Sequence, residues 1–355
     1  MATLRLRDRD AIVTKEGLIL RVFGYSHPRY AYICDTEYAP ERLFKSENPK
    51  AYRNSGSHVF YKFYGDEGWR FIQASFPHYM VFHEMLQTNV LGVDHHDLAG
   101  VRKPEVRLRT LIEAQPKDEL VSAMQEVLEL VIQHSGLSLE DFGVFGSMLH
   151  GFHHPKFSDI DFVIYGREKR AALLRTLKEL YQDGSSPLMN EFETSQSLRG
   201  KRWFFRNFTP KEFLWHQRRK LIYSLFDDPK SGRIIKTEFE SVKDWKDIQD
   251  EYCSRTRILK KGWARLLARI TEDGDSAFIP SVYQIEPLSV LEGMKEAAEV
   301  ERVVSYLEEF RMQARKDERV YVAGNLEKVT TPRSSFHQIA LTYCPRYYEQ
   351  ALKTA

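Results

Sequence analysis

Two aspartates and a Gly-Ser pair, separated by 11 residues, are the groups in this sequence best suited to chemistry. Asp159 and Asp161 open an apolar run, 162–165 (FVIY), which predicts a strand that Gly166 ends. Successive side chains of a strand point to opposite faces, so the two carboxylates share one face. Such close carboxylates repel each other unless a cation lies between them, and Mg²⁺ prefers hard oxygen ligands of this kind. We therefore expect a magnesium site, with Mn²⁺ as the alternative ion.

The Gly-Ser pair offers a place for phosphate groups next to that metal site. The short apolar run 142–145 (FGVF) predicts a strand that ends at Gly146. Gly146 lets the backbone pass close to a ligand, and we expect Ser147 to cap a helix that begins near Met148. A helix N-terminus presents unpaired N–H groups and a partial positive charge to a phosphate. The stretch 141–166 thus predicts a phosphate-binding turn, the phosphate cradle, beside a metal site.

This combination resembles the signature of the DNA polymerase beta-type nucleotidyltransferases. That signature is a hydrophobic residue, Gly, then Gly or Ser, a spacer of similar length, and a strand reading Asp-hydrophobic-Asp/Glu-hydrophobic. Residues 145–147 and 159–162 match it here, and the flanking sequence resembles uncharacterised archaeal members. The alternative is an ordinary loop–helix–strand corner with two solvated aspartates.

The resemblance implies transfer of a nucleoside monophosphate from a nucleoside triphosphate (NTP), ATP among them, to a hydroxyl, with release of pyrophosphate. Gly146 and Ser147 would bind the β- and γ-phosphates. Asp159 and Asp161 would hold two Mg²⁺ ions, of which one activates the attacking hydroxyl and the other steadies the leaving pyrophosphate.

A third carboxylate in this family usually comes from a neighbouring strand. The run 233–242 (RIIKTEFESV) predicts such a strand, on which Glu238 and Glu240 share a face. Either residue could complete the metal site and help to deprotonate the nucleophile. The family more often has Asp there, so we leave open whether one of them points at the metals or both lie on a solvated edge.

Two basic stretches mixed with aromatic residues follow the motif, 201–206 (KRWFFR) and 217–220 (QRRK). Arg and Lys dominate contacts to phosphate groups. Arg202 and Lys220 are therefore candidate nucleotide-binding residues, and solvated helix and loop faces are the alternative. The second stretch lies on the expected outer face of a helix, together with His216.

Histidines supply two further patterns that we weigh and set lower. His150, His153 and His154 follow the Gly-Ser pair at a spacing that could bring two imidazoles to a metal on a helix, or simply form a polar turn. The tripeptide 94–96 (DHH) occurs in metal-dependent phosphoesterases, but the further acidic motifs of that family are not arranged around it. We expect a polar surface loop there.

Composition narrows the class of protein. A chain of 355 residues is too long for one compact core and suggests two or three domains. Three widely separated cysteines fit a reducing compartment, and we expect a cytoplasmic protein without a zinc knuckle or disulfide scaffold. No apolar run approaches the roughly 20 residues that cross a bilayer, so we expect no membrane partner. P-loop and Gly-x-Ser-x-Gly motifs are absent from the sequence.

The expected fold class is α+β, with a central nucleotidyltransferase domain (a polymerase beta-like mixed sheet with helices) flanked by small β-rich modules. The boundaries we expect are 1–110, 111–270 and 271–355. The first module should be a small antiparallel sheet or barrel. Individual expectations are a hairpin of strands 58–64 and 69–72, helices at 118–134, 168–182, 209–225 and 300–315, and strands 320–323 and 326–329 around a turn at 324–325.

The acceptor is the least determined part of the prediction. Because β modules flank the catalytic core, an RNA, particularly a tRNA-like end, is the first candidate. A protein side chain and a small molecule such as an antibiotic come next. The alternative function is a non-catalytic nucleic-acid-binding protein whose nucleotidyltransferase core is degenerate, which the lack of the usual third Asp keeps open.

Overall fold

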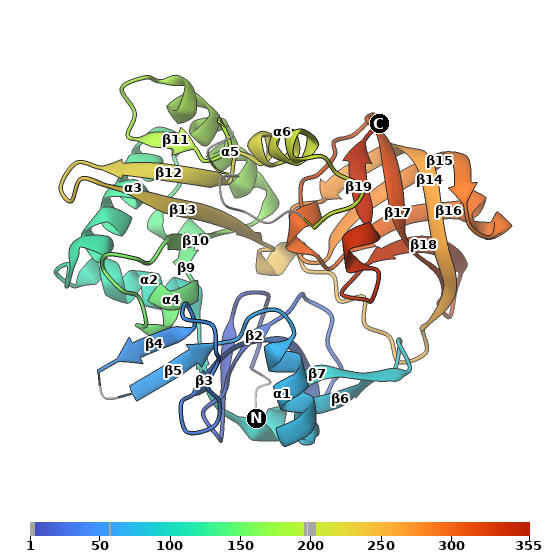
Figure 1. The fold of residues 1–355 in the computed structure, drawn as a ribbon, viewed down its shortest axis with the longest axis horizontal. Helices are drawn as coiled ribbons and strands as arrows, with labels where there is room; N and C mark the ends of the chain where they lie inside the picture. Colours follow the sequence, from blue (N-terminus) through green and yellow to red (C-terminus); the bar gives the residue numbers. More distant parts are fainter. Residues whose placement is uncertain (1–3, 57, 195–196, 198–203) are drawn as a thin grey trace. The chain divides into compact units, whose positions relative to one another are not determined.

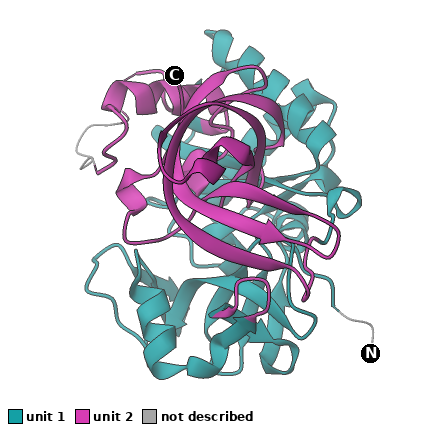
Figure 2. Cartoon of the chain, turned by 90° about the vertical axis from the view of Figure 1, so that its right-hand side faces the viewer, with its two compact units in different colours: residues 1–82, 89–189, 224–250 teal, residues 83–88, 190–223, 251–355 magenta. Residues whose placement is uncertain are grey.

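The computed structural model describes residues 4–56, 58–194, 197 and 204–355, and its elements include both helices and strands (Figure 1). They form two compact units, shown in Figure 2. The first unit comprises residues 1–82, 89–189 and 224–250, and the second comprises residues 83–88, 190–223 and 251–355.

The expected boundaries do not follow these units. The first unit contains both the expected 1–110 module and most of the 111–270 domain. The expected boundary at 270/271 falls inside β14 (Arg257–Asp275), a single long strand of the second unit. Helices occur together with mixed and antiparallel sheets, in agreement with the α+β class.

The N-terminal sheet of the first unit has the strand order β4-β5-β3-β2-β1-β8, with β7 joining β3 to β6. Its strand pairs are antiparallel, as expected for residues 1–110. The strands are β1 (Ala11–Thr14), β2 (Ile19–Val22), β3 (Ala31–Pro40), β4 (Tyr52–Ser55), β5 (His58–Lys62), β6 (Met80–His83), β7 (Thr88–Asp94) and β8 (Leu98–Arg102).

The expected strand at 69–72 is wrong, because this segment belongs to helix α1 (Glu67–Ser75). Gly68 and Ile72 are four residues apart, lie on one helical face, and are the buried residues of the helix. Gly68 packs so closely on Thr36 that a Cβ atom there would lie 2.1 Å from the threonine Oγ1. The buried face of this segment therefore has the helical period, and the alternation of Trp69 and Phe71 does not determine its structure.

The second sheet of the first unit is mixed and has the order β11-β12-β13-β10-β9. Strand β10 runs parallel to β13 and antiparallel to β9. Helices α3 and α5 contact each other, and α5 contacts β10. The elements are α2 (Pro104–Glu113), α3 (Glu119–Ser135), β9 (Phe142–Val144), α4 (Gly146–His150), β10 (Ile160–Tyr165), α5 (Arg167–Gln182), β11 (Leu188–Asn190), β12 (Tyr223–Asp228) and β13 (Arg233–Val242).

The N-terminal sheet packs against helix α4 of the same unit through a hydrophobic core. Leu149 of α4 and Phe152 just after it pack in one buried cluster with Ile19 and Tyr38 of the N-terminal sheet. The cluster also contacts Phe145, which precedes the Gly-Ser pair. The N-terminal sheet and α4 thus belong to one packed unit, and Figure 1 shows α4 beside β3, β4 and β5.

In the second unit the strand order is β14-β15-β16-β18-β17-β19, and an additional pairing of β14 with β17 closes the sheet into a barrel. Figure 2 shows these strands curving round into a ring. The C-terminal region is β-rich, as expected. Besides β14, the strands are β15 (Ser281–Glu292), β16 (Val300–Ser305), β17 (Arg319–Thr330), β18 (Ser335–Leu341) and β19 (Ala351–Thr354).

Two local expectations for this barrel are wrong. Residues 300–305 form strand β16 in place of the start of a helix, because Val303 and Val304 are buried between neighbouring strands β15 and β18. The expected turn at 324–325 does not exist, since β17 runs straight through it. Gly324 serves packing there, because a Cβ atom would lie 2.6 Å from Leu341 Cδ2.

Helix α6 (Pro210–Lys220) of the second unit has the expected capping box, in which Thr209 and Glu212 bond reciprocally. It ends at Lys220, earlier than expected, because Leu221 takes a left-handed conformation with φ of 63°. Across the described ranges, no helix combines the length and the apolar character needed to span a bilayer.

We predict that Asp118→Ala lowers the free energy of unfolding by about 1–2 kcal/mol, measured by urea denaturation. Asp118 caps α3 by accepting hydrogen bonds from the backbone N–H groups of Leu120 (3.0 Å) and Val121 (3.1 Å). Asp118→Asn is the matched control, because asparagine also caps helices and should stay near the wild-type stability. Equal losses in both variants would show that the ion pair of Asp118 with His153 matters and the cap does not.

Candidate active site

The parallel pairing of β10 and β13 brings two of the predicted acidic residues side by side. Asp161 is the direct partner of Glu238 in this ladder, so their side chains leave the same face about 4.8 Å apart. Asp159 lies two residues before Asp161 and shares that face. The structure therefore gathers Asp159, Asp161 and Glu238 at the N-terminal end of β10.

The electrostatics of the three acidic residues show crowded negative charge. Burial, together with the charges of Glu238 and Asp159, raises the pKa of Asp161 from 3.8 to about 7. The pKa of Asp159 is also raised, first by burial of its carboxylate among protein atoms and then by Glu238, although the residue as a whole keeps solvent exposure. Lys62 and Lys236 oppose both shifts. Such a cluster favours the binding of a cation.

The residues present fit magnesium in type, because all three supply carboxylate oxygens. Lys236 pairs with Glu238 at 2.6 Å, so a lysine ammonium already neutralises one of the three. In the part of the chain that the structure describes, no three His, Cys, Asp or Glu side chains converge as a finished metal centre. The carboxylate oxygens and the negative charge suit a hard divalent cation, but Glu238 is turned to a lysine.

Glu240, the second candidate for the third carboxylate, has a different environment. It is 2% exposed, and its Oε2 lies 2.8 Å from Arg9 Nη2 of the N-terminal segment. The interpretation of this strand as a solvated edge is wrong, because β13 lies between β12 and β10. Of the two candidates, Glu238 is the one that faces Asp161, and Glu240 joins β13 to residue 9.

The Gly-Ser pair packs directly against Asp161. Gly146 has φ of +62°, and a Cβ atom there would lie 2.5 Å from Asp161 Oδ2, so only glycine fits. The backbone N–H of Phe145 donates to the carbonyl of Asp161 at 2.9 Å. The expectation that Ser147 caps the helix is wrong, because α4 already begins at Gly146 and Phe145 holds the cap position.

Helix α4 is held in place by two residues of the N-terminal sheet that sequence reasoning missed. The imidazole of His150 lies 2.9 Å from Glu37 Oε2 through Nε2 and 3.0 Å from Arg102 Nη1 through Nδ1. Burial alone would raise the pKa of Glu37, but the hydrogen bond and charge of His150 lower it. Glu37 is the extra residue of a bulge between Thr36 and Tyr38, which re-aims its side chain.

The histidine expectations resolve into structural roles. His150 is buried in the contacts just described, while His153 bonds Asp118 through Nε2 at 3.0 Å, so the two imidazoles do not share a metal. The tripeptide 94–96 enters a short turn in which Asp94 accepts from the backbone N–H of His96 at 2.9 Å. This agrees with the expected polar loop.

Of the two predicted basic residues, the structure describes Lys220. Arg202 lies outside the described residues. Lys220 is 1% exposed within the second unit, where its Nζ donates to the carbonyl of Glu309 at 2.6 Å, and burial lowers its pKa well below the usual value. The expectation that α6 presents Lys220 and His216 on an outer face is wrong, because both belong to its buried face.

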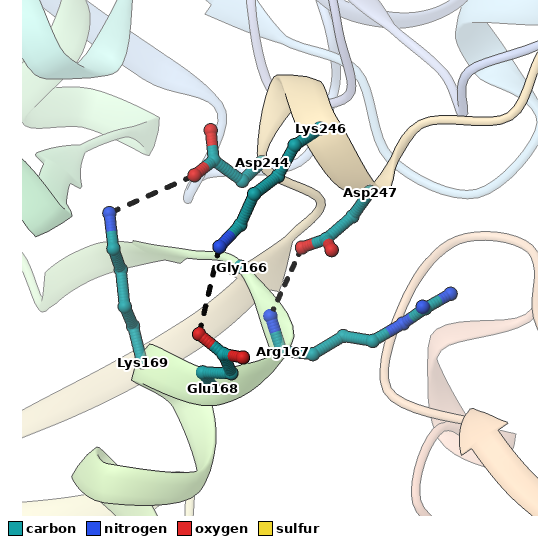
Figure 3. Close-up of a pocket in the computed structure, with 7 residues that line it drawn as sticks. All are labelled: Gly166, Arg167, Glu168, Lys169, Asp244, Lys246 and Asp247. Atoms are coloured by element: carbon teal, nitrogen blue, oxygen red, sulfur yellow. Dashed lines mark hydrogen bonds and ion pairs between the residues drawn. The ribbon is translucent and has the colours of Figure 1, made fainter.

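A separate small pocket of about 180 Å³ lies at the opposite ends of β10 and β13 (Figure 3). Strand β10 places it about 15 Å from Asp161. The charged groups that line it pair with one another: Asp247 accepts from the backbone N–H of Arg167 at 3.3 Å, and Lys169 lies 3.8 Å from Asp244. It does not belong to the carboxylate cluster. Its lining residues are Gly166, Arg167, Glu168, Lys169, Asp244, Lys246 and Asp247.

Comparison with known proteins agrees with this geometry. Residues 124–225 match the family model of the nucleotidyltransferase domain. The chain carries a nucleotidyltransferase domain. The matched residues include Gly146, Ser147, Asp159 and Asp161 and end before Glu238, so the neighbour of Asp161 on β13 emerges only from the strand register.

The chain is also similar over most of its length to an archaeal protein. An uncharacterised protein of Methanocaldococcus jannaschii is 25% identical over 329 residues, which are 92% of each chain. The similarity therefore extends beyond the nucleotidyltransferase domain to the N-terminal sheet and the barrel. No solved structure matches the chain. The resemblance stated from the Gly-Ser and Asp-Ile-Asp residues is confirmed.

We predict that removing the charge of each glutamate of β13 has a different effect on the free energy of unfolding. Glu240→Gln should lower the free energy of unfolding by about 3 kcal/mol, because it leaves Arg9 buried without the carboxylate at 2.8 Å. Glu238→Gln should cost less than about 1 kcal/mol, because its pair with Lys236 is partly exposed.

Urea denaturation of both variants measures the difference. The same two variants are then assayed for nucleotide transfer. Glu238→Gln should abolish transfer although the protein remains folded. A destabilised Glu238→Gln with intact transfer would reverse the assignment of the two residues.

Proposed function

We propose that the protein transfers a nucleoside monophosphate from an NTP to a hydroxyl acceptor, in a reaction that requires divalent metal ions and releases pyrophosphate. The nucleotidyltransferase domain supports nucleotidyl transfer in general. The observation that carries the finer proposal is the pairing of Asp161 with Glu238, with Gly146 packed on Asp161. One face thus combines three carboxylates with a backbone turn that only glycine can make.

Asp159, Asp161 and Glu238 would hold two Mg²⁺ ions, with Mn²⁺ as the alternative. Bound there, the ions would make the acceptor hydroxyl more acidic and neutralise charge on the departing pyrophosphate. Gly146 and Ser147 would present backbone N–H groups to the β- and γ-phosphates. Glu238 would accept the proton of the attacking hydroxyl, since it lies on the strand next to the two aspartates.

The resembled family usually has an Asp as its third carboxylate on the neighbouring strand. In this chain Glu238 would take that role. A degenerate core would lack an acidic residue beside Asp161 on the neighbouring strand, and this chain has one in register. The register pairing of Glu238 with Asp161 therefore supports transfer as the proposed function over a non-catalytic nucleic-acid-binding protein.

An RNA end, tRNA-like in the first instance, is the acceptor that we propose. The barrel of the second unit carries exposed aromatic residues: Tyr343 is 74% exposed and stacks on Tyr347 at 5.3 Å between ring centroids. The Arg346 guanidinium lies 3.9 Å from the ring centroid of Trp263. Aromatic rings and arginines of this kind bind single-stranded nucleic acid by stacking.

We also propose a cytoplasmic location. Cys34, Cys253 and Cys344 all lie within the described ranges and form no disulfide. Free cysteines are usual in a reducing compartment.

We predict that Asp161→Asn stabilises the metal-free protein while abolishing transfer. Between about pH 4 and pH 7 the unfolded state releases the Asp161 proton and the folded state keeps it, so this group makes the wild type less stable as pH rises. Asp161→Asn should therefore gain on the order of 2 kcal/mol at pH 8 and nothing at pH 4. Thermal unfolding at both pH values, without metal, measures this effect.

Ligand addition completes the test. Mg²⁺ with an NTP at 100 times its dissociation constant should stabilise the wild type by about 2.7 kcal/mol and leave Asp161→Asn unchanged. Incubation with each α-labelled NTP and bulk cellular RNA should label RNA only with the wild type. Asp227→Asn, an exposed aspartate of β12, is the matched control and should behave as the wild type. Full transfer by a folded Asp159→Asn/Asp161→Asn double variant would refute the proposed function.

A further inference from the structure

The N-terminal sheet turns one face toward the Gly-Ser helix. Lys62 is the register partner of Tyr38, and Phe60, two residues earlier on β5, shares its face. Phe60 stacks on Phe152 with ring centroids 4.6 Å apart, and Tyr38 packs on the same ring at 5.2 Å. Phe152 follows α4 directly, so the face that carries Lys62 is the one packed against the phosphate cradle; Figure 1 shows β5 beside α4.

The charge of Lys62 reaches the carboxylate cluster. Its positive charge lowers the pKa of Asp159 and Asp161, and also that of Glu37. Within the ranges that the structure describes, Lys62 forms no ion pair, and its nearest aromatic contact is Tyr64, whose ring centroid is 5.7 Å away. Lys236, the other lysine at the cluster, already pairs with Glu238 at 2.6 Å. Of the two lysines that act on the cluster, Lys62 is therefore the one that forms no ion pair with a carboxylate among the described residues.

We propose that Lys62 binds the triphosphate tail of the nucleotide, so that the N-terminal sheet supplies part of the nucleotide-binding site. This inference rests on the proposed function and names a residue of its substrate site. The Gly146–Ser147 turn offers only neutral N–H and O–H donors, and a triphosphate needs cationic partners as well. Lys220 does not provide one, because it is buried against a backbone carbonyl.

If the role of Lys62 is purely structural, its removal should have a different effect on the binding of polyphosphate. If Lys62 only neutralised Asp159 and Asp161, its removal would strengthen the binding of Mg²⁺ and leave polyphosphate binding as tight as before. If it binds the triphosphate, its removal strengthens binding of Mg²⁺ alone but weakens binding of magnesium tripolyphosphate. Inorganic tripolyphosphate is the suitable probe, because it requires no knowledge of the base or of the acceptor.

The experiment is isothermal titration calorimetry on the full-length protein with Mg²⁺ alone and with magnesium tripolyphosphate. Lys62→Met should bind tripolyphosphate at least about tenfold more weakly, since a hydrogen bond to a charged group is lost. Lys62→Arg should retain most of the affinity. Lys45→Met is the matched control, because Lys45 lies in the same unit, is 65% exposed and pairs with Glu41. In the transfer assay, Lys62→Met should raise KM for the NTP about tenfold and change kcat less.

Each result decides between the two proposals. Unchanged tripolyphosphate binding by Lys62→Met would overturn the role of Lys62 and leave the proposed function intact. Weaker RNA binding with unchanged tripolyphosphate binding would likewise overturn it and assign Lys62 to the acceptor. A wild-type protein that binds neither magnesium tripolyphosphate nor any NTP would overturn both proposals. Thermal unfolding of every variant identifies one that fails to fold, and Lys62→Gln then replaces Lys62→Met.

Discussion

The repulsion between Asp161 and Glu238 on adjacent strands is the constraint that the first unit must satisfy. An aromatic contact on the opposite face of the same two strands offsets this repulsion. There the register partners Phe162 and Phe239 stack with ring centroids 5.3 Å apart. One face of β10 and β13 thus carries an apolar stack and the other a cluster of carboxylates. Burial of the two rings stabilises the pairing that the carboxylates oppose, so the sheet helps to hold the acidic residues together.

The N-terminal sheet is the second part of this arrangement, and charged contacts join it to β13 and α4 in addition to the shared hydrophobic core. Residues 7–10 (RDRD) resemble a solvated charged run, yet all four are at most 4% exposed. Arg9 bonds Glu240 two residues beyond Glu238, and Glu37 bonds His150 three residues beyond Ser147. One contact fixes the strand of the third carboxylate and the other fixes the phosphate turn. The sheet therefore acts on both halves of the site.

Local signals of the sequence predicted the site better than they predicted its surroundings. Spacing along one strand or one turn placed Asp159, Asp161 and Gly146 together, because their separation is set by short-range geometry. The choice between Glu238 and Glu240 needed a partner 231 residues away, Arg9, which no local pattern reveals. The bulge that aims Glu37, the helix at 67–75 and the burial of Lys220 likewise depend on tertiary packing that overrides local propensity.

The charge balance of the site explains why nucleotide and metal should arrive together. Three carboxylates and the two ammonium groups of Lys62 and Lys236 leave one net negative charge, which Asp161 can remove by holding a proton near neutral pH. Two divalent cations alone would make the site strongly positive, and a triphosphate alone would make it strongly negative. A metal-complexed triphosphate adds almost no net charge, since the ions and the fully ionised tail cancel. Under the proposed function this charge balance favours the complex over either component, and an ion that binds Glu238 would have to displace its ion pair with Lys236.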